Sequence, residues 1–213
     1  LGSGSLGANT TGSFNTAVGR LALTANTTAS NNTAVGKSAL AANTTGTTNV
    51  AMGTAALGAN TTGDQNVAIG SEALDANTTA TGNVAVGFRA LTRNTTGGDN
   101  VAMGEAALED NTTGTLNTAV GFRALATNIT TNNCTALGYA ALENSVAAHN
   151  TAVGTYALVA NTTSAENVAV GYQALTTQTT GTRSVGIGAY ALKVSNANDN
   201  TAVGCTALDA NTT

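Results

Sequence analysis

The sequence has little charge and few aromatic side chains. Charged residues make up 8% of its 213 residues and aromatic residues 3%, and Pro and Trp are absent. A typical globular domain carries about 25% charged residues, so the usual charged surface is missing. Intrinsic disorder is not indicated, because disordered chains combine low hydrophobicity with high net charge. This chain is 42% hydrophobic with a formal charge of −4, and its small apolar residues suit only a thin core.

Other absences exclude several classes of function. No apolar run approaches the roughly 18 residues of a membrane span, and residues 1–30 lack a charged-then-apolar signal pattern. The low net charge argues against a nucleic-acid partner. His149 is the one histidine, so a His-based zinc site or a Ser-His-Asp triad lacks its parts within one chain. We therefore expect no enzyme activity, no cofactor, no metal and no membrane insertion by this segment.

What the sequence does have is a 17-residue repeat. Its anchor is the Gly that closes the motif Asn-Thr-Ala-Val-Gly. Two steps between anchors, Gly138 to Gly154 and Gly188 to Gly204, are one residue shorter than the others. The anchors are Gly2, Gly19, Gly36, Gly53, Gly70, Gly87, Gly104, Gly121, Gly138, Gly154, Gly171, Gly188 and Gly204. The repeat spans the chain, so we expect residues 1–213 to form a single repeat domain, part of a longer fibre.

The pattern within the repeat predicts an all-β fold. Asn-Thr-Ala-Val alternates like a strand, and the anchor Gly permits the positive φ of a tight turn. Ala-Leu, three and four residues after the anchor, reads as a second short strand, followed by an Asn-Thr-Thr turn. A chain that returns one layer up in this way forms a parallel β-solenoid (β-roll), whose coils are about 4.8 Å apart. We expect about 13 coils.

Glycine and asparagine serve the turns and the stacking in this prediction. The anchor glycines, exemplified by Gly19, Gly36 and Gly53, form the turns. One asparagine column lies just before the strand and begins with Asn15 and Asn32; another lies in the Asn-Thr-Thr turn and includes Asn26 and Asn43. In register, each side-chain amide is placed to donate to the carbonyl of its neighbour. The second column also matches the Asn-x-Thr glycosylation sequence, an alternative use of the same residues.

The two cysteines are too far apart to pair within the chain. Cys134 replaces an asparagine of the first column, and Cys205 follows an anchor glycine four coils later. Four coils span roughly 19 Å, which exceeds the reach of a disulfide. We expect two free thiols, with pairing between copies of the chain as the alternative.

Both faces of the predicted strand are apolar. Val18 and its equivalents share one face with Thr16 and its equivalents, whereas Ala17 points to the other face. A single solenoid has one interior, so the second face either packs on another copy or stays exposed as an association surface. We favour association, and a parallel homotrimer is the most economical closed arrangement.

The repeat resembles a known group of fibrous proteins. Asn-Val-Ala-Val-Gly-Tyr-Gln-Ala-Leu at Asn167–Leu175 is similar to the repeats of trimeric phage tail fibres and, more loosely, to the heads of YadA-like trimeric autotransporter adhesins. The resemblance covers essentially Gly2–Thr213. It implies a trimeric β-roll outside the cell, on a cell surface or a virion. The repeat is longer than the usual adhesin-head repeat, and residues 1–213 contain no neck, heptad stalk, membrane anchor or chaperone segment, so we expect them to be the shaft or head portion alone.

Charged and aromatic residues are confined to variable positions at the turns. Most of these positions are expected to be the solvated edges of the rod. The alternative is a binding surface on which Phe88, Phe122, Tyr139 and Tyr172 form one lateral stripe. Such a stripe could contact a cell-surface glycan or a protein.

Three functions follow from this pattern. The first is a structural or adhesive segment of an extracellular fibre, a rigid rod that presents side chains for surface attachment. The second is a self-assembling extracellular filament subunit. The third is ice binding through columns of Thr, although adjacent Thr residues do not share a strand face as Thr-x-Thr would.

Overall fold

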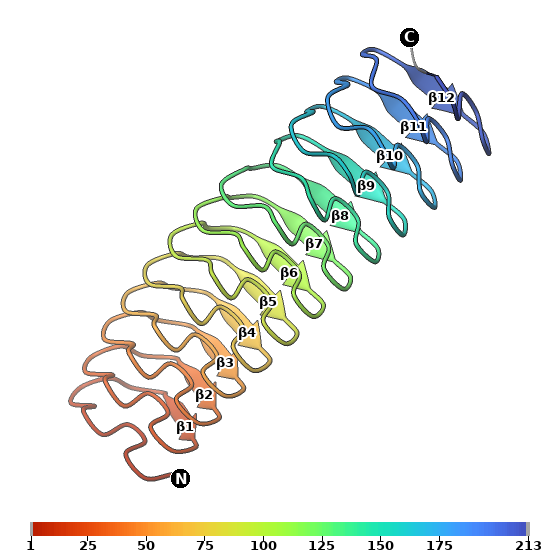
Figure 1. The fold of residues 1–213 in the computed structure, drawn as a ribbon. Coiled ribbons are helices and arrows are strands. Elements are labelled where there is room, and N and C mark those ends of the chain that lie inside the picture. The colour runs from red at the N-terminus through yellow and green to blue at the C-terminus, as the bar shows by residue number, and fades with distance from the viewer. Residues whose placement is uncertain (1, 212–213) are drawn as a thin grey trace.

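The chain folds into a rod of stacked coils with one short strand per coil (Figure 1). The computed structural model describes residues 2–211, and these residues contain no helix. The strands are β1 (Thr16–Val18), β2 (Thr33–Val35), β3 (Val50–Met52), β4 (Val67–Ile69), β5 (Val84–Val86), β6 (Val101–Met103), β7 (Thr118–Val120), β8 (Thr135–Leu137), β9 (Thr151–Val153), β10 (Val168–Val170), β11 (Val185–Ile187) and β12 (Thr201–Val203). The predicted all-β parallel solenoid with a 17-residue repeat is confirmed.

All strands belong to one parallel sheet in chain order, β1 to β12. Equivalent repeat positions pair in every step, as in Thr16↔Thr33 between β1 and β2. The two shorter steps keep this register, because Thr135 pairs with Thr151 and Val185 with Thr201. The missing residue is therefore absorbed in the turn before the strand. Residues 2–211 contain twelve strands that stack in about 11 turns, fewer than the 13 coils expected from the anchors, because no strand of these residues precedes Gly2.

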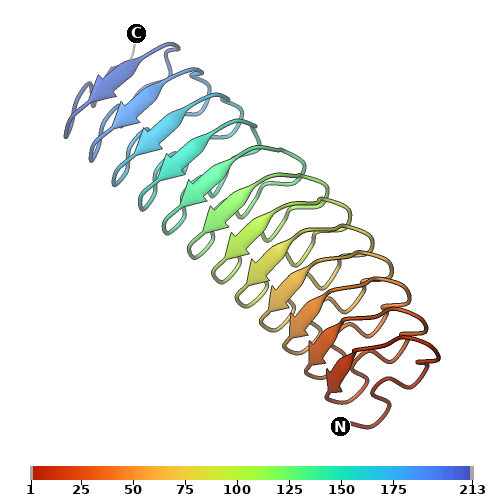
Figure 2. The same cartoon turned by 180° about the vertical axis from the view of Figure 1, so that it is seen from behind.

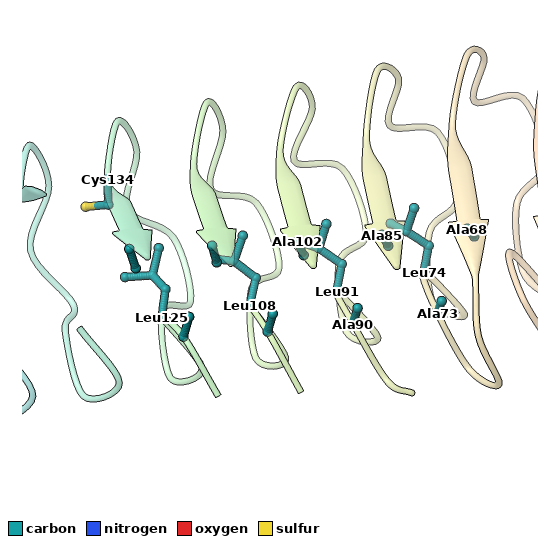
Figure 3. Packing of buried hydrophobic residues seen from close by; sticks show 14 of the residues in the cluster. Ala68, Ala73, Leu74, Ala85, Ala90, Leu91, Ala102, Leu108, Leu125 and Cys134 are labelled. Carbon is teal, nitrogen blue, oxygen red and sulfur yellow. The ribbon is translucent and has the colours of Figure 1, made fainter. Parts of the chain in front are cut away.

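The core is a single file of leucines between two columns of alanine (Figure 3). In the coil that begins at Gly70, Leu74 points from the turn segment towards the strands, and Ala73 and Ala85 are buried with it. The central residue of each strand is buried and its two neighbours are not, as in β4 with Ala68. Small side chains at these positions bring the two sides of the coil close together, which accounts for the alanine-rich composition.

The second predicted strand is wrong. Ala22 and Leu23, which would point to opposite faces of a strand, are both fully buried. Leu23 has a φ of 51°, and the equivalent leucines share this left-handed conformation. A left-handed residue breaks the alternation of a strand, so consecutive side chains both turn inwards. The segment still pairs with its neighbour, because the main-chain N–H of Leu23 donates to the carbonyl of Ala39 at 3.0 Å.

The anchor glycines are required for two separate reasons. Gly19, Gly36 and Gly53 have φ values of 134°, 137° and 143°, a region that side chains disfavour. Each also lies against the next anchor, since a Cβ on Gly19 would lie 2.5 Å from the carbonyl oxygen of Gly36. The anchors thus form a column in which backbones meet directly, and the predicted turn role of these glycines agrees with this geometry.

The asparagines of the Asn-Thr-Thr turn form a buried side-chain ladder. In each step, Nδ2 of one asparagine donates to Oδ1 of the asparagine in the preceding coil, at 2.7–3.2 Å. The same nitrogen donates to the carbonyl three residues ahead, as from Asn43 to Gly46 at 2.9 Å. We call this set the turn ladder; it consists of Asn9, Asn26, Asn43, Asn60, Asn77, Asn94, Asn111 and Asn128.

The asparagines before the strand use their amides differently. The main-chain N–H of Asn32 donates to Oδ1 of Asn15 at 3.0 Å. Nδ2 of Asn32 instead donates to the carbonyl of Gly46 in the next turn, at 2.9 Å. In most steps of this column, Oδ1 of one asparagine thus accepts from the main-chain N–H of the next residue in the column, and in some steps it also accepts from the side-chain amide, as from Asn66 to Asn49. The sequence predicted only the side-chain bond. Both columns satisfy buried polar groups that would otherwise be costly to bury.

The two requirements on the anchor glycines can be separated by experiment. Gly121 and Gly204 have nearly equal φ values, 130° and 132°. A Cβ on Gly121 would meet Gly138 O at 2.5 Å, whereas one on Gly204 would meet nothing closer than 3.8 Å. We expect Gly121→Ala to destabilise the rod by about 1–3 kcal/mol more than Gly204→Ala, because it adds overpacking to backbone strain. Urea unfolding measures both, and equal losses would contradict the stacking requirement.

Removal of one turn-ladder amide should destabilise the rod measurably. Asn43→Ala removes the donor to Asn26 and the acceptor for Asn60. An unsatisfied buried polar group costs about 1–3 kcal/mol, so we expect a loss of that size in urea unfolding. Thr45→Ala is the matched control, since Thr45 is exposed in the same turn and should change stability little.

Candidate interaction surfaces

The outer face of the sheet is uncharged, largely apolar and uncovered in the described part of the chain. The third residue of each strand points outwards, and Val18, Met52 and Met103 are 47%, 42% and 41% exposed. The first residue of each strand, Thr or Val, also faces out. Strands β1–β12 contain no charged residue, and Figure 2 shows them in one row with no other segment across them. We call this surface the strand face.

The predicted aromatic stripe is only partly contiguous. Phe122 and Tyr139 stack, with ring centroids 5.4 Å apart and planes 13° from parallel. Phe88 is separated from Phe122 by the coil of Glu105, which has no aromatic residue at this position. Tyr172 lies further along the rod and contacts Tyr190 rather than the other predicted members.

Two residues outside the predicted stripe complete the row. Tyr156 meets Tyr139 edge to face at 5.2 Å, and Tyr190 meets Tyr172 in the same way at 5.3 Å. Both lie two residues after their anchor, whereas the predicted members lie one residue after it. Aromatic side chains in neighbouring coils can meet even when one lies first and the other second after its anchor glycine. A search of both positions would have found these residues. We call Phe122, Tyr139, Tyr156, Tyr172 and Tyr190 the aromatic row.

The rings of the aromatic row mainly contact one another. The hydrogen bond with Tyr139, followed by partial desolvation, raises the pKa of Tyr156. Partial desolvation and the neighbouring Tyr172 raise the pKa of Tyr190. Nζ of Lys193 lies 5.0 Å from the centre of the Tyr190 ring, a cation–π contact. Stacking on a sugar requires a free ring face, and the Phe122–Tyr139 stack uses one face of each ring.

Charged side chains pair between coils at the edges of the rod. Arg89 lies between Glu72 and Glu109, with N–O distances of 3.6 and 2.9 Å. Arg183 binds Asp199 through two nitrogens, at 2.7 and 2.9 Å, and this hydrogen bonding lowers the pKa of Asp199. Exposed pairs of this kind contribute little to stability. Their positions agree with the interpretation of these residues as solvated edges.

The Asn-Thr-Thr turns use their first Thr for stacking and expose the second. The hydroxyl of Thr44 donates to the carbonyl of Thr61 at 3.0 Å, and Thr45 is exposed. The second threonines of these turns therefore form an exposed column, and Thr10 and Thr162 are exposed beside it. The asparagine of the same turn, such as Asn43, is fully buried and its Nδ2 makes two hydrogen bonds. A glycan on this nitrogen is incompatible with the folded coil, which favours the ladder over the glycosylation alternative.

In residues 2–211, no group of three His, Cys, Asp or Glu side chains is placed to hold a metal ion, and the surface of this part of the chain has no pocket. Cys134 is buried and Cys205 exposed, and neither forms a disulfide, as expected within one chain. Burial raises the pKa of the Cys134 thiol. None of these residues lies in a helix long and apolar enough to span a bilayer.

Comparisons with known proteins found no match. The chain matches no protein-family model, and neither a curated protein nor a solved structure is significantly similar to it.

The turn ladder is interrupted in the coils that carry the tyrosines. Beyond Asn128 its positions are taken by Ser145, Asn161, Gln178 and Ser195. Oδ1 of Asn161 is buried without a hydrogen-bond partner, because Gln178 directs its Nε2 to Asn167 and Gly181 instead. Oε1 of Gln178 is also unsatisfied. These coils lack the axial side-chain bonds of the preceding ones.

Restoration of asparagine at this point should stabilise the rod. Gln178→Asn places a side-chain donor where Asn161 Oδ1 has none. Relief of a buried unsatisfied group is worth about 1–3 kcal/mol, and loss of one buried methylene costs about 1 kcal/mol, so we expect a gain of about 1 kcal/mol. Urea unfolding measures the gain. Asn161→Ala in the same background should abolish it; a gain that survives this second change would contradict the ladder explanation.

Proposed function

We propose that this chain is a rigid structural or adhesive segment of an extracellular fibre, of the kind found in bacterial surface adhesins or phage tail fibres. Copies of the chain associate side by side through the strand face as a parallel homotrimer. The observation that supports this proposal is an uncharged apolar face along the whole sheet of a rod whose core is already complete.

The strand face is long, narrow and continuous. Strand spacing and residue rise make it about 55 Å long and about 10 Å wide, so its footprint is on the order of 500 Å². The largest apolar patch of an ordinary monomer is about 300–600 Å² and is often functional, and a standard interface takes about 800 Å² of accessible surface per partner. The footprint lies within the range of functional patches and below a standard interface, so the case for self-association comes from the continuity of the face along the rod and not from its area.

The uniformity of the strand face favours another copy as its occupant. Every coil presents the same pair of outward positions, one Thr or Val and one Val, Ile, Met or Leu. An identical rod has the same axial repeat, so contacts made at one coil recur at every other coil. In a parallel trimer the two outward columns of each chain meet those of its neighbours around the axis, with equivalent coils at one level.

Charges on the strand face should dissociate the assembly without unfolding the rod. Ile69 and Met103 are exposed and point away from the core, so we expect Ile69→Glu with Met103→Glu to convert trimer to monomer in sedimentation velocity. Thr79→Glu with Thr113→Glu adds the same charge at exposed turns and should leave the mass unchanged. A monomeric parent chain at high concentration would overturn the trimer.

Surface attachment is the adhesive part of the proposal. Phe88, Phe122, Tyr139 and Tyr172 are exposed outside the strand face, and with Tyr156 and Tyr190 they gather aromatic side chains on one side of the turns that a surface could contact. Because the rings already touch one another, the row would offer ring edges and hydroxyl groups to a glycan or a protein.

A further inference from the structure

All four tyrosines of the chain lie in four successive coils. They form two pairs in ring contact, Tyr139 with Tyr156 and Tyr172 with Tyr190, at centroid distances of 5.2 and 5.3 Å. Tyr139 is 45% exposed and Tyr172 43% exposed. Each pair therefore combines two phenols from neighbouring coils with access for a reagent in solution.

The pairs occupy the part of the rod where the turn ladder is interrupted. The coil of Tyr139 carries Ser145 at the ladder position, that of Tyr172 carries Gln178, and that of Tyr190 carries Ser195. Asn161, in the coil of Tyr156, has an unsatisfied Oδ1. Tyrosine contacts thus connect neighbouring coils where amide-to-amide bonds do not.

We propose that Tyr139–Tyr156 and Tyr172–Tyr190 are sites of oxidative cross-linking to dityrosine. The co-reactant is a peroxide used by a haem peroxidase. Each phenol loses one electron and one proton to give a phenoxyl radical. The two radicals join through a ring carbon ortho to each oxygen, and the hydrogen on each joined carbon moves as a proton to the phenolic oxygen. One peroxide accepts the two electrons and two protons and becomes two molecules of water.

The neighbours of each pair favour coupling between its own two tyrosines. Phe122 covers Tyr139 on the side away from Tyr156, and it has no phenol with which to couple. Lys193 lies over Tyr190 and likewise offers no phenol. Two radicals held in contact by the fold react as an intramolecular pair, which is far more efficient than an encounter between separate chains. The product would tie neighbouring coils covalently where the ladder does not.

The experiment is peroxidase treatment of the intact chain with limiting hydrogen peroxide. We expect dityrosine fluorescence, a product that still migrates as a single chain in denaturing electrophoresis, and cross-linked peptides that join Tyr139 to Tyr156 and Tyr172 to Tyr190. Tyr156→Phe and Tyr190→Phe keep the rings and should each reduce the fluorescence about twofold, and the double variant should lose it.

A matched control separates pair geometry from mere exposure. Phe14 is 86% exposed and lies near the other end of the rod, so Phe14→Tyr adds an accessible phenol without a neighbouring tyrosine. It should add no single-chain cross-link. Cross-links found only between chains, a dominant Tyr156–Tyr172 link, or fluorescence unchanged in the double variant would each overturn the proposal.

Discussion

The structure depends on the alignment of equivalent residues in successive coils at the spacing of one β-strand. That alignment places strand on strand, glycine on glycine and amide on amide. Each contact type fits only if the others do, because a shift by one residue would turn the buried alanines to solvent and the outward residues into the core. The two shortened repeats show how strictly the register holds, since both lose their residue in the turn and keep the strand pairing.

The repeat was enough to predict the solenoid and its 17-residue period, and it placed glycine at the turns and asparagine in stacked columns; the burial of those columns was not predicted. The prediction of a strand at Ala22 and Leu23 was wrong because Leu23 has a left-handed backbone conformation. Leucine rarely adopts this conformation, so its intrinsic propensity favours a strand. The aromatic row was only partly foreseen, since Tyr156 and Tyr190 lie one position off the column that the repeat defines. Nε2 of Gln178 donates to Asn167 and Gly181 and not to Asn161. This preference depends on the longer side chain of glutamine and could not be read from the repeat pattern.

Different types of side chain occupy the interior, the edges and the sheet face of the rod. One part of its interior is packed with leucine and alanine, and the other part consists of hydrogen-bonded asparagine. Its edges carry paired charges, and the outer side of its sheet is an apolar face. The chain completes its own core and still exposes this face, which is the basis of the assembly proposed above. The scarcity of charge follows from this division, because the strand residues and the ladder positions exclude it.

The turn ladder also makes the rod electrically directional. Seven successive bonds run from Nδ2 of one asparagine to Oδ1 of the asparagine before it. Eight amide groups, seven of them buried, therefore point the same way, and their dipoles add like those of the peptide units in a short helix. The low-numbered end of the ladder carries the partial positive charge and the end at Asn128 the partial negative charge. Two rods side by side would thus repel slightly when parallel and attract when antiparallel, so a parallel assembly must draw its preference from side-chain packing.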